Sequence, residues 1–399
     1  MSSAHFLLDL AIILLSTKLL GLFASKLKMP QVVGALLAGI IIGPSVLNIV
    51  HGTAFIKQMA ELGVIILMFG AGLETDLKEL KKCGKASFVI ALIGVILPLI
   101  GGFIIASFFN KGNTSLNITN KSFLENIFIG VILTATSVSI TVETLQELGK
   151  LKTNSGTAIL GAAILDDILG IIILTIITSS TDPSVHISTV LLKIAVFFLL
   201  AIIMGIGFKY LFNIISKEYG EKKRLAIFAF SFCLILAFIA EEYFGVADIT
   251  GAYIAGVFVS NTTHSHYIEE KFHNISFLLL SPIFFASIGL EMTLQNSGLS
   301  MLIFTLLLIF VSILTKIIGC GLGARICGYT KEESLQIGVG MVSRGEVALI
   351  VANKGASIGL LSPNLFPPII LVVIVTTLIT PILLKLVYSE RYVHTHAAA

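Results

Sequence analysis

Apolar segments long enough to cross a lipid bilayer as α-helices follow one another along nearly the whole chain. Hydrophobic residues make up 56% of the 399 residues and charged residues only 12%, with a mean hydropathy of +1.01. A soluble domain carries about 25% charged residues, because water has to solvate its surface. The composition therefore excludes a soluble enzyme and does not imply a nucleic-acid partner. It predicts one all-α polytopic membrane unit over residues 1–399, embedded in a lipid bilayer.

Thirteen of these segments are separated by polar breaks. We expect membrane-spanning helices over 5–25, 31–50, 55–73, 86–109, 124–147, 154–179, 187–215, 224–243, 247–262, 272–292, 300–326, 333–356 and 366–388. With the N-terminus outside, eighteen Lys and Arg residues fall on the inner side and four on the outer side. Positive residues concentrate in cytoplasmic loops, so we expect the N-terminus outside and the C-terminus in the cytoplasm.

A pattern of small residues occurs twice at a constant offset of 217 residues. Each copy places two Gly/Ala pairs in one segment and a Gly-Leu-Glu sequence at the end of the next. The first copy contains Gly34, Ala35, Ala38, Gly39 and Glu74, and the second contains Gly251, Ala252, Ala255, Gly256 and Glu291. Under the topology above, Glu74 lies inside and Glu291 outside. We therefore expect segments one to six and eight to thirteen to form an inverted repeat, with 187–215 as the linker helix.

Two segments at matching positions of this repeat contain polar or glycine residues where an apolar helix would be expected. The fifth segment carries hydroxyl groups in its middle, at Thr134, Thr136, Ser137, Ser139 and Thr141. The twelfth carries Gly338, Gly340, Ser343 and Gly345 around Arg344 and Glu346. Hydroxyls can satisfy the backbone groups that an unwound turn releases. We expect two broken helices that cross near the membrane centre, although a packing face of small residues is an alternative for either segment alone.

Three charged residues lie deep within the predicted membrane segments. Asp166 and Asp167 are central in the sixth segment and Lys316 is central in the eleventh. Buried charges are costly, so each needs a function or a partner. Adjacent helix residues point about 100° apart, so we expect the two acids to have different roles. Lys316 needs an anionic partner, which either acid can provide. The alternative to a functional role is a structural one, with interhelical salt bridges at the acids and a permanent ion pair at the lysine.

Other charges in or near the segments receive simpler interpretations. Arg344 and Glu346 are interpreted mainly as structural charges that neutralise exposed helix ends at the crossing. Glu143 and Asp248 lie nearer the membrane interfaces, where a solvated or capping carboxylate is expected.

Two buried carboxylates beside hydroxyls and released carbonyl groups form an oxygen site for a small hard cation. Na⁺, Li⁺ and H⁺ fit such a site. A carboxylate binds either a proton or a metal ion, so a group that holds both in turn couples their fluxes by competition. We therefore expect Asp166 and Asp167 to bind Na⁺, with no resident cofactor. This competition is the mechanism of an antiporter, which is a transporter and not an enzyme.

The order of these residues resembles one known family. Thr134-Ala135-Thr136-Ser137-Val138, Leu165-Asp166-Asp167, Lys316 and Ser343-Arg344-Gly345-Glu346 are similar to motifs of the bacterial monovalent cation/proton antiporters of the NapA, GerN and Kef group. The resemblance implies an NhaA-type fold in a bacterial plasma membrane, a homodimer, and an elevator-like movement. It implies a core at about 84–180 and 299–388 that moves against a dimerisation scaffold at about 1–75 and 224–295.

The resemblance also implies individual roles. Asp167 matches the main ion-binding carboxylate, Asp166 the acid that pairs with the lysine at Lys316, and Thr136 and Ser137 the crossing-point residues near the ion. Arg344 and Glu346 match the charged pair of the opposite broken helix. Kef-type potassium systems have Gln in place of the first Asp and carry a further C-terminal domain. This chain has Asp166 instead and ends soon after its last segment, and both differences favour sodium as the exchanged cation. The presence of Lys316 implies electrogenic exchange.

The leading hypothesis is therefore exchange of Na⁺ or Li⁺ for H⁺. A K⁺/H⁺ antiporter is the first alternative, because site dimensions decide cation preference. A cation channel is a weaker alternative, since the sequence contains no TVGYG-like filter. A sodium-coupled organic solute symporter is the third alternative, although no residue pattern identifies an organic ligand.

Overall fold

The fold was analysed in a computed structural model. It describes residues 5–27, 29–75, 77–109, 121–181, 187–219, 222–262, 264–290, 299–357 and 359–389. Within these ranges every regular element is a helix. The elements are α1 (His5–Lys26), α2 (Gln31–Ile42), α3 (Ala54–Glu74), α4 (Leu77–Phe109), α5 (Lys121–Thr134), α6 (Val138–Glu147), α7 (Asn154–Thr181), α8 (Ile187–Tyr219), α9 (Lys222–Phe238), η1 (Ile239–Tyr243), α10 (Asp248–Ser260), α11 (Ser265–Ile275), η2 (Ser276–Leu280), α12 (Ser281–Leu290), α13 (Leu299–Ile326), α14 (Lys331–Gly340), α15 (Glu346–Ser357), η3 (Pro363–Leu365) and α16 (Phe366–Val387).

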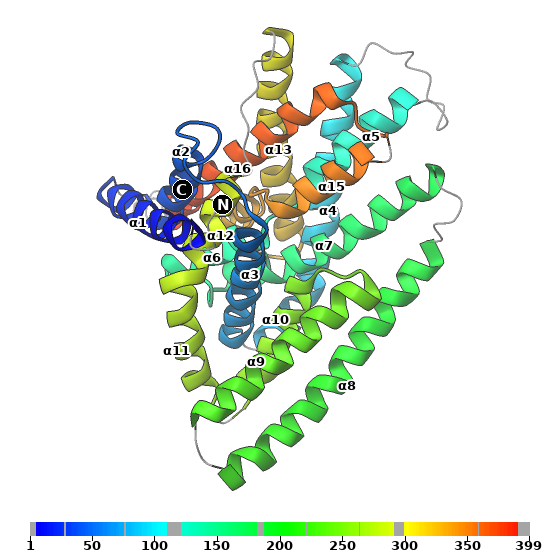
Figure 1. Cartoon of the computed structure of the whole chain (residues 1–399). Helices are drawn as coiled ribbons and strands as arrows, with labels where there is room; N and C mark the ends of the chain where they lie inside the picture. Colours follow the sequence, from blue (N-terminus) through cyan, green and yellow to red (C-terminus); the bar gives the residue numbers. More distant parts are fainter. Residues whose placement is uncertain are drawn as a thin grey trace.

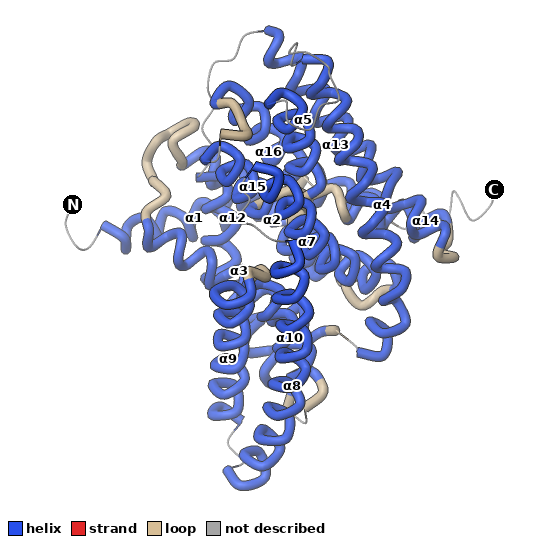
Figure 2. Tube along the Cα trace, turned by 90° about the vertical axis from the view of Figure 1, so that its right-hand side faces the viewer, coloured by secondary structure: helices blue, strands red, loops and turns tan. Residues whose placement is uncertain are grey.

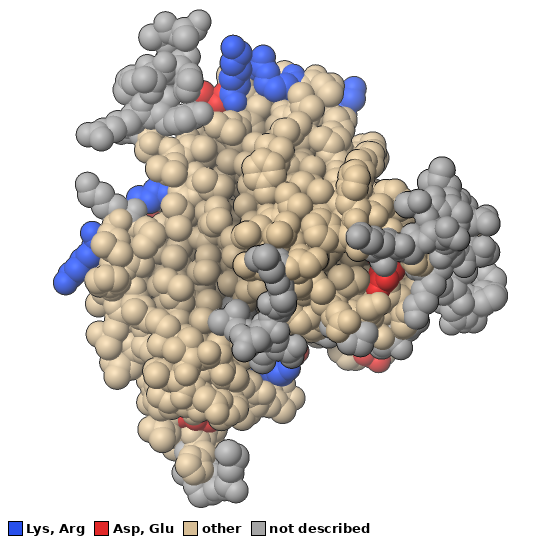
Figure 3. All heavy atoms as spheres, turned by 90° about the horizontal axis from the view of Figure 1, so that it is seen from above, with Lys and Arg blue, Asp and Glu red and all other residues tan. Residues whose placement is uncertain are grey.

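The described residues contain ten helical stretches that are long and apolar enough to cross a membrane, and α2 and α10 are shorter apolar helices. Large apolar side chains are exposed on the outside, among them Phe108 at 74% and Ile326 at 71%. Figure 3, a view from above, shows charged side chains at scattered places on a mostly uncharged face. The polytopic membrane class predicted from composition is therefore confirmed.

The predicted end of the second helix is wrong. The helix expected over 31–50 ends at Ile42, because Gly43 has an extended conformation and Pro44 follows it. Proline cannot supply the backbone N–H that would continue a helix. The segment after it instead forms turns that bond back to the end of α2, where the amides of Ile49 and Val50 donate to the Ile42 carbonyl.

The helices pack as two groups (Figures 1 and 2). The crossing-helix group contains α4 to α7 and α13 to α16, and its closest packing is between α4 and α13. The flanking group contains α1 to α3 and α9 to α12, where α2 packs on α1 and α12, and α3 packs on α10. The long helix α8 contacts α7 on one side and α9 and α10 on the other.

Backbone contacts in the flanking group repeat at the offset predicted from the sequence. A Cβ atom built on Gly39 would lie 2.1 Å from the carbonyl oxygen of Ala286. A Cβ atom built on Gly256, 217 residues after Gly39, would lie 2.3 Å from the carbonyl oxygen of Phe69, 217 residues before Ala286. Two equivalent helix crossings therefore need glycine for the same reason, which is direct contact between backbones.

Both helices predicted to be broken are interrupted in the structure. The residues from Ala135 to Ser137 separate α5 from α6, and those from Met341 to Gly345 separate α14 from α15. Both breaks lie inside the crossing-helix group and are buried from solvent. This confirms the prediction made from the hydroxyl and glycine residues.

Candidate ion-binding site

The two breaks meet and satisfy each other's backbone groups. The Ser137 amide donates to the Ser343 carbonyl at 2.8 Å, and the Ser343 hydroxyl donates to the Ser137 carbonyl at 2.8 Å. The Thr141 hydroxyl lies 2.8 Å from both the Gly340 carbonyl oxygen and the Ser343 hydroxyl. The hydroxyls therefore replace the backbone partners that each helix loses where it is interrupted.

Arg344 occupies the crossing and is completely buried. Its guanidinium donates to the carbonyl oxygens of Leu133 at 2.6 Å, Val342 at 2.9 Å and Ser312 at 3.2 Å. Leu133 lies in the last turn of α5 and Val342 just after the end of α14, so the positive charge lies at two helix C-termini. Glu346 is the first residue of α15, and its side chain is outside the described part of the structure.

Asp166 and Lys316 form a buried ion pair between α7 and α13. Lys316 Nζ lies 2.9 Å from Asp166 Oδ1, and the two side chains are 0% and 1% exposed. The other carboxylate oxygen, Oδ2, is buried and has no hydrogen-bond partner within the described residues. Thr136 is close enough to interact with this carboxylate, and its hydroxyl also lies 3.4 Å from the Met341 carbonyl oxygen. The site therefore joins α7 and α13 to both breaks.

Asp167 is buried next to this pair, at 6% exposed. As the following residue of α7, it points about 100° away from Asp166. Ser137 is completely buried at the crossing, where its hydroxyl lies 3.2 Å from that of Ser139. All the predicted site residues whose side chains are described are thus buried, and the lysine is paired with Asp166.

One residue that supports the site was not singled out from the sequence. A Cβ atom built on Gly94 of α4 would lie 2.3 Å from Cys320 Sγ and 4.0 Å from Lys316 Nζ. Glycine at this position lets α4 lie directly against the face of α13 that carries the lysine. The available signal was a set of glycines along the fourth and eleventh segments, among them Gly94, Gly101, Gly319 and Gly323. Such residues permit close approach of membrane helices.

The family description "Sodium/hydrogen exchanger, transmembrane" matches residues 11–389 of the chain. The chain belongs to this exchanger family. Its relatives include the Na⁺/H⁺-K⁺ antiporter GerN of Bacillus cereus, which is 42% identical over 393 residues and covers 97% of both chains. The Na⁺/H⁺ antiporter of Enterococcus hirae is 33% identical, covering 97% of this chain and 99% of the relative. The exchanger is therefore a membrane transporter of a monovalent cation/proton antiporter family.

The fold agrees with this assignment. The exchanger is similar to the sodium proton antiporter MjNhaP1 of Methanocaldococcus jannaschii, with a TM-score of 0.73 at 20% identity over 100% of this chain and 99% of that one. Because transport in this family needs no cofactor, the ions that the exchanger moves are its substrates. It is a transporter and not an enzyme.

Proposed function

We propose that this exchanger moves Na⁺ or Li⁺ in one direction and H⁺ in the other, through competition at the paired acids. The observation that carries the proposal is the buried ion pair between Asp166 and Lys316, with Asp167 as the next residue on the helix. A buried carboxylate beside two helix breaks offers oxygen ligands to a cation and a binding site for a proton.

The proposed cycle assigns a separate task to each charged residue. Asp167 holds the cation after releasing its proton, with Thr136 and Ser137 supplying oxygen atoms nearby. Asp166 shifts from Lys316 toward the cation, and the lysine then loses the partner that favours its charged form and releases a proton. Two protons leave for each monovalent cation, so the exchange is electrogenic. Arg344 stays in place and neutralises the helix ends.

The packing in two groups supports the movement proposed for the exchanger. Residues 84–180 and 299–388 act as a core that slides as an elevator against a scaffold of residues 1–75 and 224–295. Residues 187–215 link the two. We further propose thirteen membrane spans in an inverted repeat of the NhaA type, with the N-terminus outside and the C-terminus in the cytoplasm. The scaffold pairs with that of a second copy in a bacterial plasma membrane.

Potassium is the second candidate cation. The name of the Bacillus cereus relative includes K⁺, and a Saccharomyces cerevisiae relative that is 30% identical over 414 residues is named K⁺/H⁺ antiporter 1. This chain covers 97% of its own length in that match but only 47% of the yeast protein. Ligand distances in the occupied site decide between the cations.

The test uses the purified protein in liposomes that contain a pH-sensitive dye and carry an imposed proton gradient. Added Na⁺ should dissipate the gradient, and Li⁺ and K⁺ are compared at the same concentration. A response larger with K⁺ than with Na⁺ would favour the second candidate. No response to any of the three ions would refute both.

A further inference from the structure

The end of α6 and the turn that follows it reach from the crossing-helix group to three helices of the flanking group. Glu147 contacts the beginning of α2, Gln146 contacts the end of α3, and Lys152 lies 3.8 Å from Glu269 of α11. The Lys152 side chain is 65% exposed, so this last pair contributes little. The contacts of Gln146 and Glu147 remain to be explained.

Glu147 holds the N-terminus of α2 with both of its carboxylate oxygens. Oε1 and Oε2 each lie 2.8 Å from the backbone nitrogen of Gln31, which is the first residue of α2. Pro30 occupies the N-cap position of this helix and makes no side-chain cap. A carboxylate at a helix N-terminus is favoured both by the hydrogen bond and by the helix dipole. The capping group of α2 thus comes from the other group of helices.

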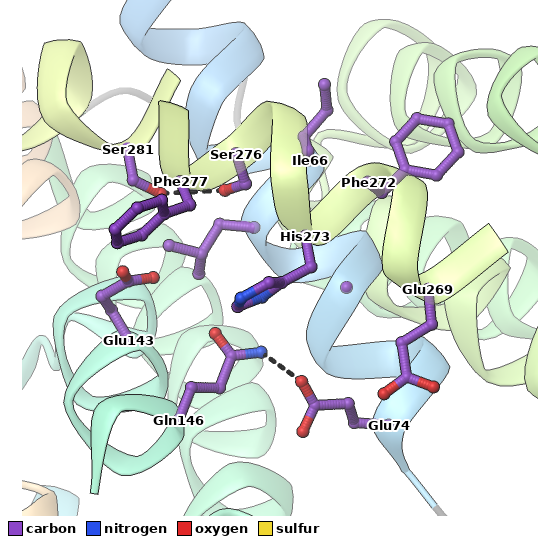
Figure 4. A pocket seen from close by; sticks show the side chains of 12 residues that line it. Ile66, Glu74, Glu143, Gln146, Glu269, Phe272, His273, Ser276, Phe277 and Ser281 are labelled. Atoms are coloured by element: carbon purple, nitrogen blue, oxygen red, sulfur yellow. Dashed lines mark hydrogen bonds between the residues drawn. The ribbon is translucent and has the colours of Figure 1, made fainter. Parts of the chain in front are cut away.

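Gln146 makes a second bond of the same kind. Its Nε2 donates to Glu74 Oε1 at 2.8 Å, and Glu74 is the last residue of α3. Figure 4 shows Gln146 reaching toward Glu74 beside a small cavity of about 20 Å³. Two adjacent residues of α6 therefore bond to two different flanking helices.

The turn after α6 connects these bonds rigidly to the ion-binding site. Gly149 has a left-handed φ of +65°, and its amide donates to the Gln146 carbonyl at 2.9 Å. The Thr153 hydroxyl then accepts from the Gly156 amide at 3.1 Å at the beginning of α7. α6 begins next to Ser137 at the crossing and α7 carries both acids. Gln146 and Glu147 therefore move with the helices that hold the ion.

A larger cavity of about 520 Å³ lies between the two groups at the same place. Its lining comes from α1, α2, α6, α11, η2 and α12 and includes Gln31, Glu143, Gln146 and Glu147. The two α6 residues that bond to the flanking group thus also line the space between the groups. Any movement of one group along the other has to change this space and break these bonds.

We propose that Gln146 and Glu147 form a latch that holds the crossing-helix group against the flanking group in the conformation seen here. The latch opens once in each transport cycle, and its strength sets the population of this conformation. This inference rests on the proposed function, because it assumes that the two groups move relative to each other during exchange.

The first experiment locks the latch covalently. The double variant Gln31→Cys/Glu147→Cys is treated with a short bifunctional thiol reagent that is cleaved by reductant, and exchange is measured in liposomes before and after cleavage. We expect loss of exchange on cross-linking and recovery on reduction. The two single variants and the unmodified protein, with its four native cysteines, receive the same treatment as controls. Exchange at the uncross-linked rate in fully cross-linked protein would overturn the proposal.

The second experiment reads the conformation without transport and does not depend on the first. In Glu74→Cys/Gln146→Cys protein, the initial rate of cross-linking reports how often the two groups are in contact at this position. Adding Glu147→Ala should lower this rate a few-fold, because a hydrogen bond to a charged but exposed carboxylate is lost from one conformation only. Adding Glu147→Gln should have a smaller effect, since one acceptor oxygen remains.

The matched control is Glu242→Ala, which removes an exposed carboxylate from η1 in the flanking group. Unchanged cross-linking in the Glu147→Ala protein, with correct folding shown by gel filtration, would overturn the latch. Failure of the proposed function is a separate result. In that case the unmodified protein gives no dye response to Na⁺, Li⁺ or K⁺, whatever the cross-linking rates are.

Discussion

The two helix groups both pack closely through glycine, but they differ in the polar contacts that hold their helices together. In the flanking group, helices touch through glycine and backbone, as at Gly39 against Ala286 and Gly256 against Phe69. The crossing-helix group also has such contacts, as at Gly338 against Ile317, but two of its helices are broken and held by hydroxyls and buried charges, as at Ser343 and Arg344. Lipid chains are as apolar as the side chains of a helix, so packing and hydrogen bonds hold such helices together. Backbone packing is thus common to both groups, whereas the buried charges Asp166, Lys316 and Arg344 lie in the crossing-helix group.

The difference also appears in the symmetry of the two groups. The flanking contacts repeat with equivalent small residues, so both copies have the same chemistry. At the crossing, the Ser137 amide donates to the Ser343 carbonyl, whereas the Ser343 hydroxyl donates to the Ser137 carbonyl. The charges differ too, since α7 supplies Asp166 and Asp167 and α13 supplies Lys316. The charged side chains at the crossing therefore do not repeat, unlike the glycine contacts of the flanking group.

The largest effect is expected from Asp167→Asn in the crossing-helix group. The amide keeps the size of the side chain but cannot exchange a proton for a cation, so exchange should fall to the rate of empty liposomes. The measurement is the dye response to Na⁺, with gel filtration to check folding. Glu242→Gln is the control, because it neutralises an exposed carboxylate in the flanking group. Exchange at the rate of the unmodified protein would remove Asp167 from the ion-binding site.

Lys316→Gln should affect both transport and stability. It leaves Asp166 buried without its ion partner, and loss of one member of a buried pair costs about 3–5 kcal/mol. We expect thermal unfolding in detergent at a lower temperature and loss of the transport current on a solid-supported membrane. Lys193→Gln, which changes an exposed lysine of α8, is the control. Currents equal to those of the unmodified protein would make the lysine a purely structural residue.

Gly39→Ala tests the backbone contact between α2 and α12 in the flanking group. The new methyl group would meet the Ala286 carbonyl oxygen, so α2 and α12 would have to separate, at a cost of about 1–3 kcal/mol. We expect a lower unfolding temperature and an unchanged apparent affinity for Na⁺. Gly207→Ala on α8 adds a methyl group where no atom lies within 4 Å, and it should be neutral or slightly stabilising. Equal unfolding temperatures in the two variants would contradict the backbone contact.

Ser343→Ala should lower the stability moderately and tests how much the polar contacts at the crossing contribute to it. It removes the bond to the Ser137 carbonyl and the contact with Thr141, which should cost about 1–3 kcal/mol at a buried position. The comparison is Ser287→Ala in α12, whose hydroxyl donates to the Phe284 carbonyl of the same helix. Denaturation curves should show a larger loss for Ser343→Ala. A smaller loss than for Ser287→Ala would mean that the crossing does not depend on this hydroxyl.

The smallest effect concerns Tyr388, just after the end of α16. The Ser155 hydroxyl donates to Gln336 at 2.7 Å, so the Tyr388 hydroxyl donates to Ser155 at 2.8 Å. Burial raises the pKa of Tyr388 above its usual value of about 10. The stabilising contribution is then full below about pH 10 and is lost as the pH rises through the higher folded-state pKa.

The Tyr388→Phe variant should lose about 1 kcal/mol at neutral pH through its missing hydrogen bond. It should also unfold with a weaker pH dependence above about pH 10 than the unmodified protein. Thermal unfolding measured from neutral to strongly alkaline pH checks both expectations. An equally steep alkaline decline in both proteins would show that other groups cause it.

Several parts of the molecule were predictable because each follows from a local requirement of the membrane. The breaks near Thr136 and Ser343 were visible because hydroxyls and glycines interrupt apolar segments. The need of Lys316 for an acid followed from the cost of an isolated buried charge. The end of α2 at Ile42 was misjudged because apolar residues continue beyond Pro44, and hydropathy alone does not detect a helix stop.

Contacts between residues far apart in the chain could not be predicted from the sequence. Glu143 was expected to be a solvated or capping carboxylate, yet it lines a cavity between the two groups. Nothing near Glu147 in the chain indicates that it caps a helix 116 residues away. Such a bond depends on where two rigid groups lie relative to each other, and hydrogen-bonding capacity alone carries no information about distance.

The sequence by itself determined that this chain crosses a membrane, that part of it repeats after 217 residues, and that two acids and a lysine are buried where helices break. Only the tertiary structure decided that Asp166 pairs with Lys316, which carbonyl groups Arg344 holds, and that Glu147 joins the two groups. The physical reason is that a bilayer requires each segment that crosses it to be long enough and apolar enough, and this requirement can be checked one segment at a time. Partners are chosen by packing, which brings together residues far apart in the chain.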